Sequence, residues 1–313
     1  MAKSIALLFS GQGAQQVGMG SDLSQRFAAA ANRFAAADAA LGYSISQIAF
    51  GGPTEELTQT SRCQVALYVH GIAVLEILRE QLGNFPVVAA AGLSLGEFTA
   101  HAAAGTFDFL TGLRLVANRG RYMEEACDST SGAMAAFIGG DEENVRKIAH
   151  EAEVDLANMN SPGQIVLSGA VENVRKAVEL AKQYGIRRAL PLNVAGAFHS
   201  RLMMPAEIKL RGDLSTIQIT KPATKVVANV TAKPVFDEGE IRDSLAEQVT
   251  GTVRWTESVE YMLDQLGCDL FLELGPGQVL AGLVGRIRKG TEVLSIGDQP
   301  SLARALNRLR DLI

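Results

Sequence analysis

Short apolar runs alternate with longer segments of helical periodicity along most of this chain of 313 residues, and this alternation favours an α/β fold. We expect strands at residues 5–9, 87–91, 225–230 and 270–274. We expect helices after a cap at Ser21 and over residues 64–82, 97–104, 111–126, 256–266, 279–288 and 301–312. Because long crossover segments separate the strands, the sequence predicts a large domain built around a parallel sheet.

Residues 130–195 follow a different pattern. Their predicted order is strand (133–138), helix (142–151), strand (154–159), strand (164–168), helix (172–184) and strand (187–192). This β-α-β-β-α-β order is that of the ferredoxin-like unit. Asp141 is a suitable N-cap for the first of these helices. We therefore expect a small ferredoxin-like domain of residues 130–195, inserted into a discontinuous large domain of residues 1–129 and 196–313.

The composition excludes several classes of protein. Hydrophobic residues make up 47% and charged residues 20% of the chain, as in soluble globular proteins. A net charge of −5 argues against a broad nucleic-acid surface, and no apolar stretch reaches the ~20 residues of a membrane span. The apolar run at residues 5–9 is too short for a signal peptide. Three scattered cysteines predict reduced thiols and no metal site, so we expect a cytoplasmic protein.

The segment Gly92-Leu93-Ser94-Leu95-Gly96 lies between a predicted strand and a predicted helix. A serine on such a sharp turn points its hydroxyl out of the sheet, as a nucleophile requires. The N–H of Leu95 opens the helix and can donate to an oxyanion. The alternative is a βα turn of small residues with no chemical role. The flanking strand and helix favour a nucleophilic Ser94.

The proton acceptor for Ser94 is inferred by elimination among four histidines. His101 lies seven positions further along the same helix, about 10 Å up its axis and out of reach. His70 has the surroundings of a core residue, and His150 has those of a surface residue. His199 follows the predicted small domain, at a seam where catalytic groups are often found. A structural histidine at the seam is the alternative reading.

No acidic residue presents itself as the third member of a catalytic triad, since Asp213, Asp237 and Asp243 lie in polar segments typical of the surface. A Ser–His dyad whose imidazole is oriented by a carbonyl or an amide would serve.

In the glycine-rich loop after the first strand, the Gln12 amide is a candidate oxyanion donor, although a plain turn is the alternative. Arg119 lies on a helix that we otherwise expect to be largely buried, where it suits either a substrate carboxylate or an internal salt bridge.

Seven segments in order resemble the malonyl-CoA:acyl carrier protein transacylases of fatty acid synthesis and the acyltransferase units of polyketide synthases. They are FSGQGAQQVGMG, GLSLGEF, RGRYM, NMNSPGQIVLSG, AFHS, VRWTESVEYM and FLELGPGQVL, and they extend from the first strand to about residue 285. The resemblance implies a hydrolase-like large domain with a ferredoxin-like insert. The sequence departs from the family at Leu93, where histidine is usual, and at Ser10, where proline is usual.

The resemblance also implies roles for individual residues. Ser94 would accept the acyl group, and His199 would be its general base. Gln12 and the N–H of Leu95 would form the oxyanion hole, and Arg119 would bind the malonyl carboxylate. Gln248 matches the position whose main-chain carbonyl orients the histidine. Asn160 and Phe198 would line the site, and Phe198 would crowd a 2-methyl branch.

The activity implied is malonyl transfer from malonyl-CoA to the phosphopantetheine thiol of acyl carrier protein, through a malonyl-serine intermediate. We expect a monomer that needs no cofactor and binds neither nucleic acid nor membranes. Two alternatives remain at this point. One is a serine thioesterase or esterase, which would not need Arg119. The other is a non-catalytic scaffold that docks carrier protein, which the presence of both Ser94 and His199 disfavours.

Overall fold

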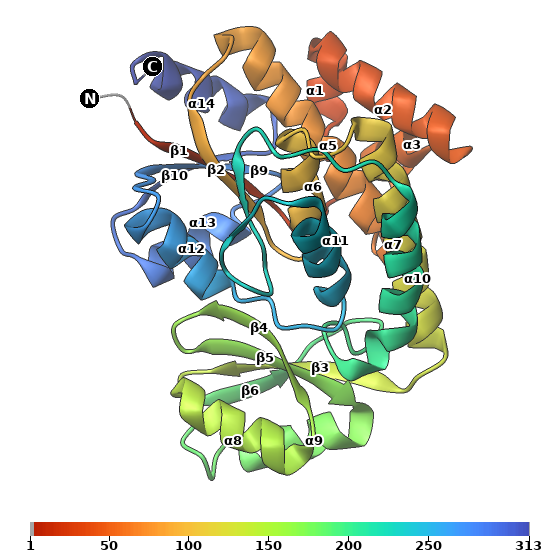
Figure 1. The fold of residues 1–313 in the computed structure, drawn as a ribbon, viewed down its shortest axis with the longest axis vertical. Coiled ribbons are helices and arrows are strands. Elements are labelled where there is room, and N and C mark those ends of the chain that lie inside the picture. Colours follow the sequence, from red (N-terminus) through yellow and green to blue (C-terminus); the bar gives the residue numbers. More distant parts are fainter. Residues whose placement is uncertain (1–2, 313) are drawn as a thin grey trace.

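The computed structural model describes residues 3–312 and confirms the α/β class (Figure 1). Its large sheet has the order β10-β9-β1-β2-β7-β8, and every neighbouring pair is parallel except β7–β8. The strands are β1 (Ile5–Phe9), β2 (Val87–Gly92), β7 (Lys225–Val227), β8 (Pro234–Val235), β9 (Leu270–Leu274) and β10 (Glu292–Ile296). In register, Phe9 pairs with both Gly92 and Leu274, so the carboxyl ends of three central strands meet at one edge.

Both faces of the large sheet are buried. Along β1, Ile5, Leu7 and Phe9 face one hydrophobic core, whereas Ala6 and Leu8 face the other. The first core is covered by α2 (Ala28–Leu41), α5 (Thr60–Leu82), α6 (Leu95–Ala103) and α7 (Phe109–Asp128), with α10 (Met204–Thr216) and α11 (Glu238–Glu247) beyond them. The second is covered by α12 (Trp255–Asp264) and α13 (Val279–Ile287). Four further α-helices pack around the large sheet: α1 (Ser21–Arg26), α3 (Ile45–Gly51), α4 (Thr54–Leu57) and α14 (Gln299–Arg310).

A small lobe with its own antiparallel sheet lies at the bottom of Figure 1. It contains β3 (Gly132–Ile138), α8 (Glu142–Ala152), β4 (Asp155–Ser161), β5 (Gln164–Ala170), α9 (Val171–Leu180) and β6 (Arg188–Pro191). This is the β-α-β-β-α-β order predicted from the sequence, and Asp141 caps α8 through a bond from the Asn144 N–H. A third hydrophobic core lies between the two helices and this sheet.

Several local predictions were wrong. The helix expected after Ser21 is capped by Gly20 and ends at Arg26, and extended backbone at Phe27 separates it from α2. The strand expected over residues 225–230 ends at Val227, which places Asn229 in a loop. The α11 helix and the β10 strand were not predicted. Polar residues fill much of α11, and four of the five β10 residues are only partly buried, so neither has a clear apolar pattern.

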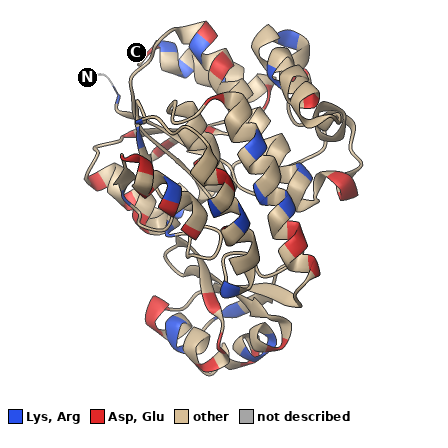
Figure 2. Ribbon diagram, turned by 45° about the vertical axis from the view of Figure 1, so that its right-hand side comes forward, with Lys and Arg blue, Asp and Glu red and all other residues tan. Residues whose placement is uncertain are grey.

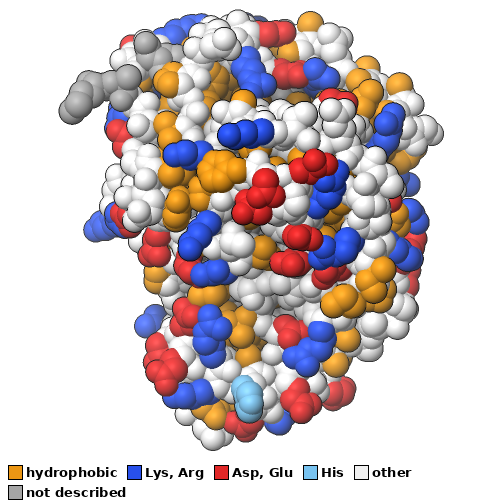
Figure 3. Space-filling view, viewed as in Figure 1, with side chains coloured by type: hydrophobic (Ala, Val, Ile, Leu, Met, Phe, Trp, Pro, Cys, Tyr) orange, Lys and Arg blue, Asp and Glu red, His pale blue; other side chains and the backbone are white. Residues whose placement is uncertain are grey.

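Charged side chains lie mainly on peripheral helices and loops (Figure 2). On the face shown in Figure 3, acidic and basic side chains are intermingled without a broad basic area. By length and composition α5 is apolar enough to cross a membrane, but 83% of its most apolar window is buried inside the protein. This burial is typical of the core helix of a globular protein.

Candidate active site

Ser94 lies on a sharp turn between β2 and α6, with a left-handed φ of 53°. The turn is tight on both sides of the serine. A Cβ at Gly92 would lie 1.9 Å from the carbonyl carbon of Gly96, and a Cβ at Gly96 would lie 2.1 Å from the carbonyl oxygen of Phe9. Only glycine fits at these two positions, since the turn packs against itself and against β1. This packing holds the serine at the carboxyl edge of the sheet.

His199 lies beside Ser94, although 105 residues separate them in the chain. Its Nε2 is 2.8 Å from Ser94 Oγ, and its Nδ1 is 2.7 Å from the main-chain oxygen of Gln248. The carbonyl oxygen can only accept a hydrogen bond, so Nδ1 carries the hydrogen and Nε2 is free to act as a base. Burial, followed by the charge of Arg119, lowers the pKa of His199 to about 4. The imidazole is therefore neutral at physiological pH.

Arg119, on α7, is 1% exposed and points its guanidinium at Ser94. One Nη2 bond reaches Ser94 Oγ at 2.9 Å and another reaches Gln248 Oε1 at 2.8 Å, while Nη1 donates to Gln64 Oε1 at 2.7 Å. Within residues 3–312 no carboxylate forms an ion pair with Arg119, and its Nε has no hydrogen-bond partner. Burial lowers its pKa to about 10, so the group remains charged at neutral pH.

Glu97 is a buried residue of this site that the sequence analysis missed. It lies on the first turn of α6 and is fully buried, and its Oε2 accepts bonds from the Asn229 N–H at 3.0 Å and from Gln248 Nε2 at 2.5 Å. Asn229 in turn accepts from the Ser94 N–H at 2.7 Å and donates to the Gly92 oxygen at 2.8 Å. Burial raises the pKa of Glu97 to about 7. The available signal was an acidic residue among small and apolar neighbours in LGEFTAHAA.

The two expected oxyanion donors lie on adjoining loops. The N–H of Leu95 is the first of α6, and the loop after β1 approaches so closely that a Cβ at Gly11 would lie 2.4 Å from the Leu93 oxygen. The Gln12 side chain donates to Thr60 Oγ1 at 3.4 Å. No hydrogen bond in the described part of the chain uses the main-chain N–H of either Gln12 or Leu95. Both N–H groups therefore lack a hydrogen-bond partner within residues 3–312, and Leu95 is fully buried.

Asn160 and Phe198 are less directly connected to the dyad. Asn160 lies on β4, half-buried, and its Oδ1 has no partner among residues 3–312. No hydrogen bond joins it to Ser94 or His199 in that part of the chain. Phe198, immediately before His199, is 6% exposed and packs into the core of the large sheet. Of the remaining histidines, His70 and His101 are buried away from the dyad and His150 is exposed on α8.

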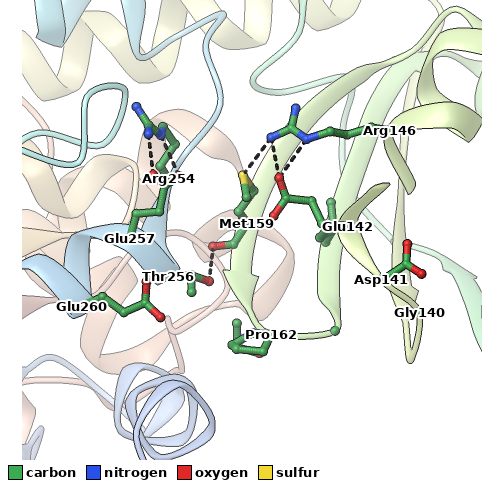
Figure 4. Close-up of a pocket in the computed structure, with 13 residues that line it drawn as sticks. Gly140, Asp141, Glu142, Arg146, Met159, Pro162, Arg254, Thr256, Glu257 and Glu260 are labelled. Atoms are coloured by element: carbon green, nitrogen blue, oxygen red, sulfur yellow. Dashed lines mark hydrogen bonds and ion pairs between the residues drawn. The ribbon is translucent and has the colours of Figure 1, made fainter. Parts of the chain in front are cut away.

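A groove of about 730 Å³ lies elsewhere, between the small lobe and α12 (Figure 4). Its arginines are already paired within it. Arg146 bonds Glu142 at 2.7 Å, and Arg254 bonds Glu257 through its Nε at 2.8 Å. Neither Ser94 nor His199 lines this groove, so it is separate from the dyad. Within residues 3–312 no group of three or more histidine, cysteine or acidic side chains is arranged to hold a metal ion.

Comparisons with known proteins agree on one family. Residues 6–293 match the family described as acyl transferase domain. The chain is 40% identical over 312 residues to the malonyl CoA-acyl carrier protein transacylase of Bacillus subtilis, covering 98% of both chains. It is 40% identical to that organism's polyketide biosynthesis malonyl CoA-acyl carrier protein transacylase, covering 93% of this chain and 99% of the relative. A solved malonyl-transacylase in complex with a type II polyketide acyl-carrier protein matches with a TM-score of 0.93 at 39% identity, covering 97% and 99% of the two chains.

Proposed function

This chain belongs to the acyl transferase domain family, and from that membership we propose that it transfers malonyl groups from malonyl-CoA to acyl carrier protein through a malonyl-Ser94 intermediate. One observation carries the proposal. Ser94 Oγ lies 2.8 Å from a neutral imidazole nitrogen and 2.9 Å from a buried guanidinium that forms no direct ion pair with a carboxylate of residues 3–312. A base activates the serine, and a cation beside it suits an acyl group that ends in a carboxylate.

In the first half-reaction, His199 takes the proton of Ser94 as the oxygen attacks the thioester carbonyl. The oxyanion of the tetrahedral intermediate is bound by the N–H of Leu95 and by Gln12. Because the Gln12 side chain already bonds Thr60, its main-chain N–H is the donor we propose. The C–S bond then breaks, and coenzyme A leaves as a thiol with the proton held by His199.

In the second half-reaction, the phosphopantetheine thiol of the carrier protein gives its proton to His199 and attacks malonyl-Ser94. The intermediate collapses to the malonyl thioester, and the proton returns to Ser94. Gln248 holds the imidazole ring in the required orientation through its main-chain oxygen at 2.7 Å. Asn160 and Phe198 complete the walls of the acyl site in this proposal.

Arg119 accounts for transfer rather than hydrolysis. A malonyl carboxylate bound to the guanidinium orients the acyl group, so a positioned thiol gains an effective-molarity advantage over water. An acetyl group leaves the buried cation without an anionic partner. A serine esterase or thioesterase would have no use for this residue.

We also propose that the two lobes are separate domains, of residues 130–195 and of residues 1–129 with 196–313, because the small lobe has its own core. We place the protein in the cytoplasm as a monomer that works without a cofactor. All three cysteines are free and buried, which supports a reducing compartment.

The test is a mass measurement after incubation with malonyl-CoA. We expect a stable malonyl adduct that is absent in Ser94→Ala and is discharged by holo acyl carrier protein. Ser168→Ala is the matched control, since the Ser168 hydroxyl is buried in the small lobe without a partner among the described residues. Rapid release of free malonate would instead indicate an esterase, and no adduct in the wild type would indicate a scaffold.

A further inference from the structure

We propose, on the basis of the proposed function, that Glu97 is a positioning residue that fixes the direction of the Gln248 amide and thereby leaves Arg119 free for the substrate carboxylate. Glu97 touches neither Ser94 Oγ nor His199 through any hydrogen bond of the described residues. It acts through Gln248, the residue that follows α11.

The amide of Gln248 has one accepting and one donating end, and its neighbours determine which way each end points. Its Nε2 donates to Glu97 Oε2 at 2.5 Å and to the main-chain oxygen of Ser94 at 2.9 Å. Its Oε1 accepts from Arg119 Nη2 at 2.8 Å. The Ser94 carbonyl oxygen and Glu97 Oε2, which also accepts from the Asn229 N–H, act as acceptors, and a guanidinium only donates. A reversed amide would face two acceptors with an oxygen and a donor with an NH₂ group. Glu97, the Ser94 peptide and Arg119 together therefore allow a single orientation.

This arrangement holds Arg119 without a direct ion pair to a carboxylate of the described residues. The guanidinium is held by two amide oxygens, from Gln64 at 2.7 Å and from Gln248 at 2.8 Å. The carboxylate of Glu97 lies one side chain further away, behind the Gln248 amide. If Glu97 occupied the place of that amide, it would pair with Arg119 directly, and a substrate carboxylate would have to displace it. The neutral amide therefore acts as a spacer between an internal acid and the substrate-binding cation.

The same amide connects the other parts of the site. Gln248 bonds the Ser94 peptide through its side chain and His199 through its main-chain oxygen at 2.7 Å. Loss of Glu97 should therefore slow the transfer of every acyl group to some extent. If Glu97 also places Arg119, its loss should slow malonyl transfer more than acetyl transfer.

The decisive variant exchanges the two side chains, Glu97→Gln with Gln248→Glu. It keeps the same atoms and net charge, loses the bond from residue 248 to the Ser94 main-chain oxygen, and places the carboxylate directly on Arg119. We expect the ratio of kcat/KM for malonyl-CoA over acetyl-CoA to fall at least about tenfold. Glu97→Leu, which removes the acceptor, should lower the ratio similarly. Glu97→Gln alone retains an accepting oxygen and should keep the ratio within about threefold of the wild type.

Glu273→Gln is the matched control, because Glu273 is a buried carboxyl on β9 that accepts from the Leu280 and Ala281 N–H groups away from the dyad. Its ratio should equal that of the wild type. A folded exchange variant or a folded Glu97→Leu variant with the wild-type ratio would overturn the inference. So would loss of malonyl preference in the near-isosteric Glu97→Gln, even if the other two variants fail to fold. Failure of the wild type to form malonyl-Ser94 in the same assay would instead overturn the proposed function.

Discussion

At the scale of single residues, the site depends on two residues whose backbone conformation is unfavourable. Ser94 and His199 have φ values of 53° and 56°, in the region that L-residues rarely adopt. Such conformations persist only where the surroundings impose them, at a cost of about 1–3 kcal/mol each. For Ser94 the surroundings are Asn229 and Gln248, which bond its N–H and its carbonyl oxygen. Ser94 is thus placed by its main chain as well as by its side chain.

Arg119 is the residue whose removal should change specificity most. Arg119→Ala should lower kcat/KM for malonyl-CoA by roughly 10–100-fold, because the substrate carboxylate loses a charged partner in a buried site. Acetyl transfer should fall much less, so the ratio of kcat/KM for malonyl-CoA over acetyl-CoA should decrease. Steady-state kinetics with the two thioesters measure this ratio.

The neighbouring Arg121 provides the control for that experiment. It lies two positions further along α7, is 54% exposed at its side chain and pairs with Glu125 at 2.7 Å. Arg121→Ala should leave both rates unchanged, since exposed pairs of this kind contribute little. An Arg119→Ala enzyme that kept the full malonyl preference would contradict the carboxylate-binding role.

At the scale of elements, the turn from β2 into α6 is the least tolerant segment of the site. Gly92→Ala places a Cβ 1.9 Å from the Gly96 backbone, and only a backbone shift can relieve this contact. We expect a loss of at least about 2–3 kcal/mol in the free energy of unfolding, together with loss of malonyl-serine formation. Urea denaturation and the mass assay measure the two effects.

Gly212→Ala tests whether this sensitivity belongs to the turn or to glycine in general. Gly212 is exposed on α10, and a Cβ there would meet no atom within 4 Å. Alanine at this helical position should stabilise the protein by about 0.5–1 kcal/mol and leave activity intact. If Gly212→Ala lost as much stability and activity as Gly92→Ala, the steric explanation of the turn would be contradicted.

At the scale of the whole molecule, buried titratable groups make stability depend on pH. Burial lowers the pKa of His70 to about 4, of His101 to about 3 and of His199 to about 4. As the pH falls below 6.5, these imidazoles take up protons in the unfolded chain before they do so in the folded chain, so the free energy of unfolding decreases until the folded pKa values are reached. Burial also raises the pKa of Glu97 and of Glu273. These two carboxyls take up protons in the folded chain first, so they increase the free energy of unfolding as the pH falls towards 4.5.

The contribution of one histidine is isolated by His70→Gln. His70 is fully buried, and its Nε2 lies 3.0 Å from the Gly297 oxygen, which a glutamine amide can also reach as a donor. Between pH 6.5 and pH 4 the variant should lose less stability than the wild type, by on the order of 2–3 kcal/mol. His150→Gln replaces an exposed histidine and is the matched control. Parallel pH profiles for the wild type and His70→Gln would contradict this account.

Much of the architecture was predictable because its causes are local. The strands β1 and β9 were predicted with the bounds they have. The β1 strand is a continuous apolar run that ends at Ser10, and β9 is an apolar run, interrupted only by Glu273, that ends at Gly275. The turn at Ser94 was predictable from Gly92 and Gly96, which its tight geometry requires. The order of elements in the small lobe followed from periodicity and from turn residues.

What only the tertiary structure decided is which distant side chains meet. His199 was reached by elimination, but its distance from Ser94 depends on how the chain returns from the small lobe to the edge of the large sheet. Glu97 was missed because its partners, Asn229 and Gln248, lie 132 and 151 residues away and belong to a loop and a helix end with no apolar pattern. Local periodicity determines strands, helices and turns, whereas contacts between residues far apart in the chain depend on strand order and packing. The sequence by itself therefore determined the turn and indicated Ser94 as the predicted nucleophile, and the tertiary structure decided the network that holds Ser94, His199 and Arg119 together.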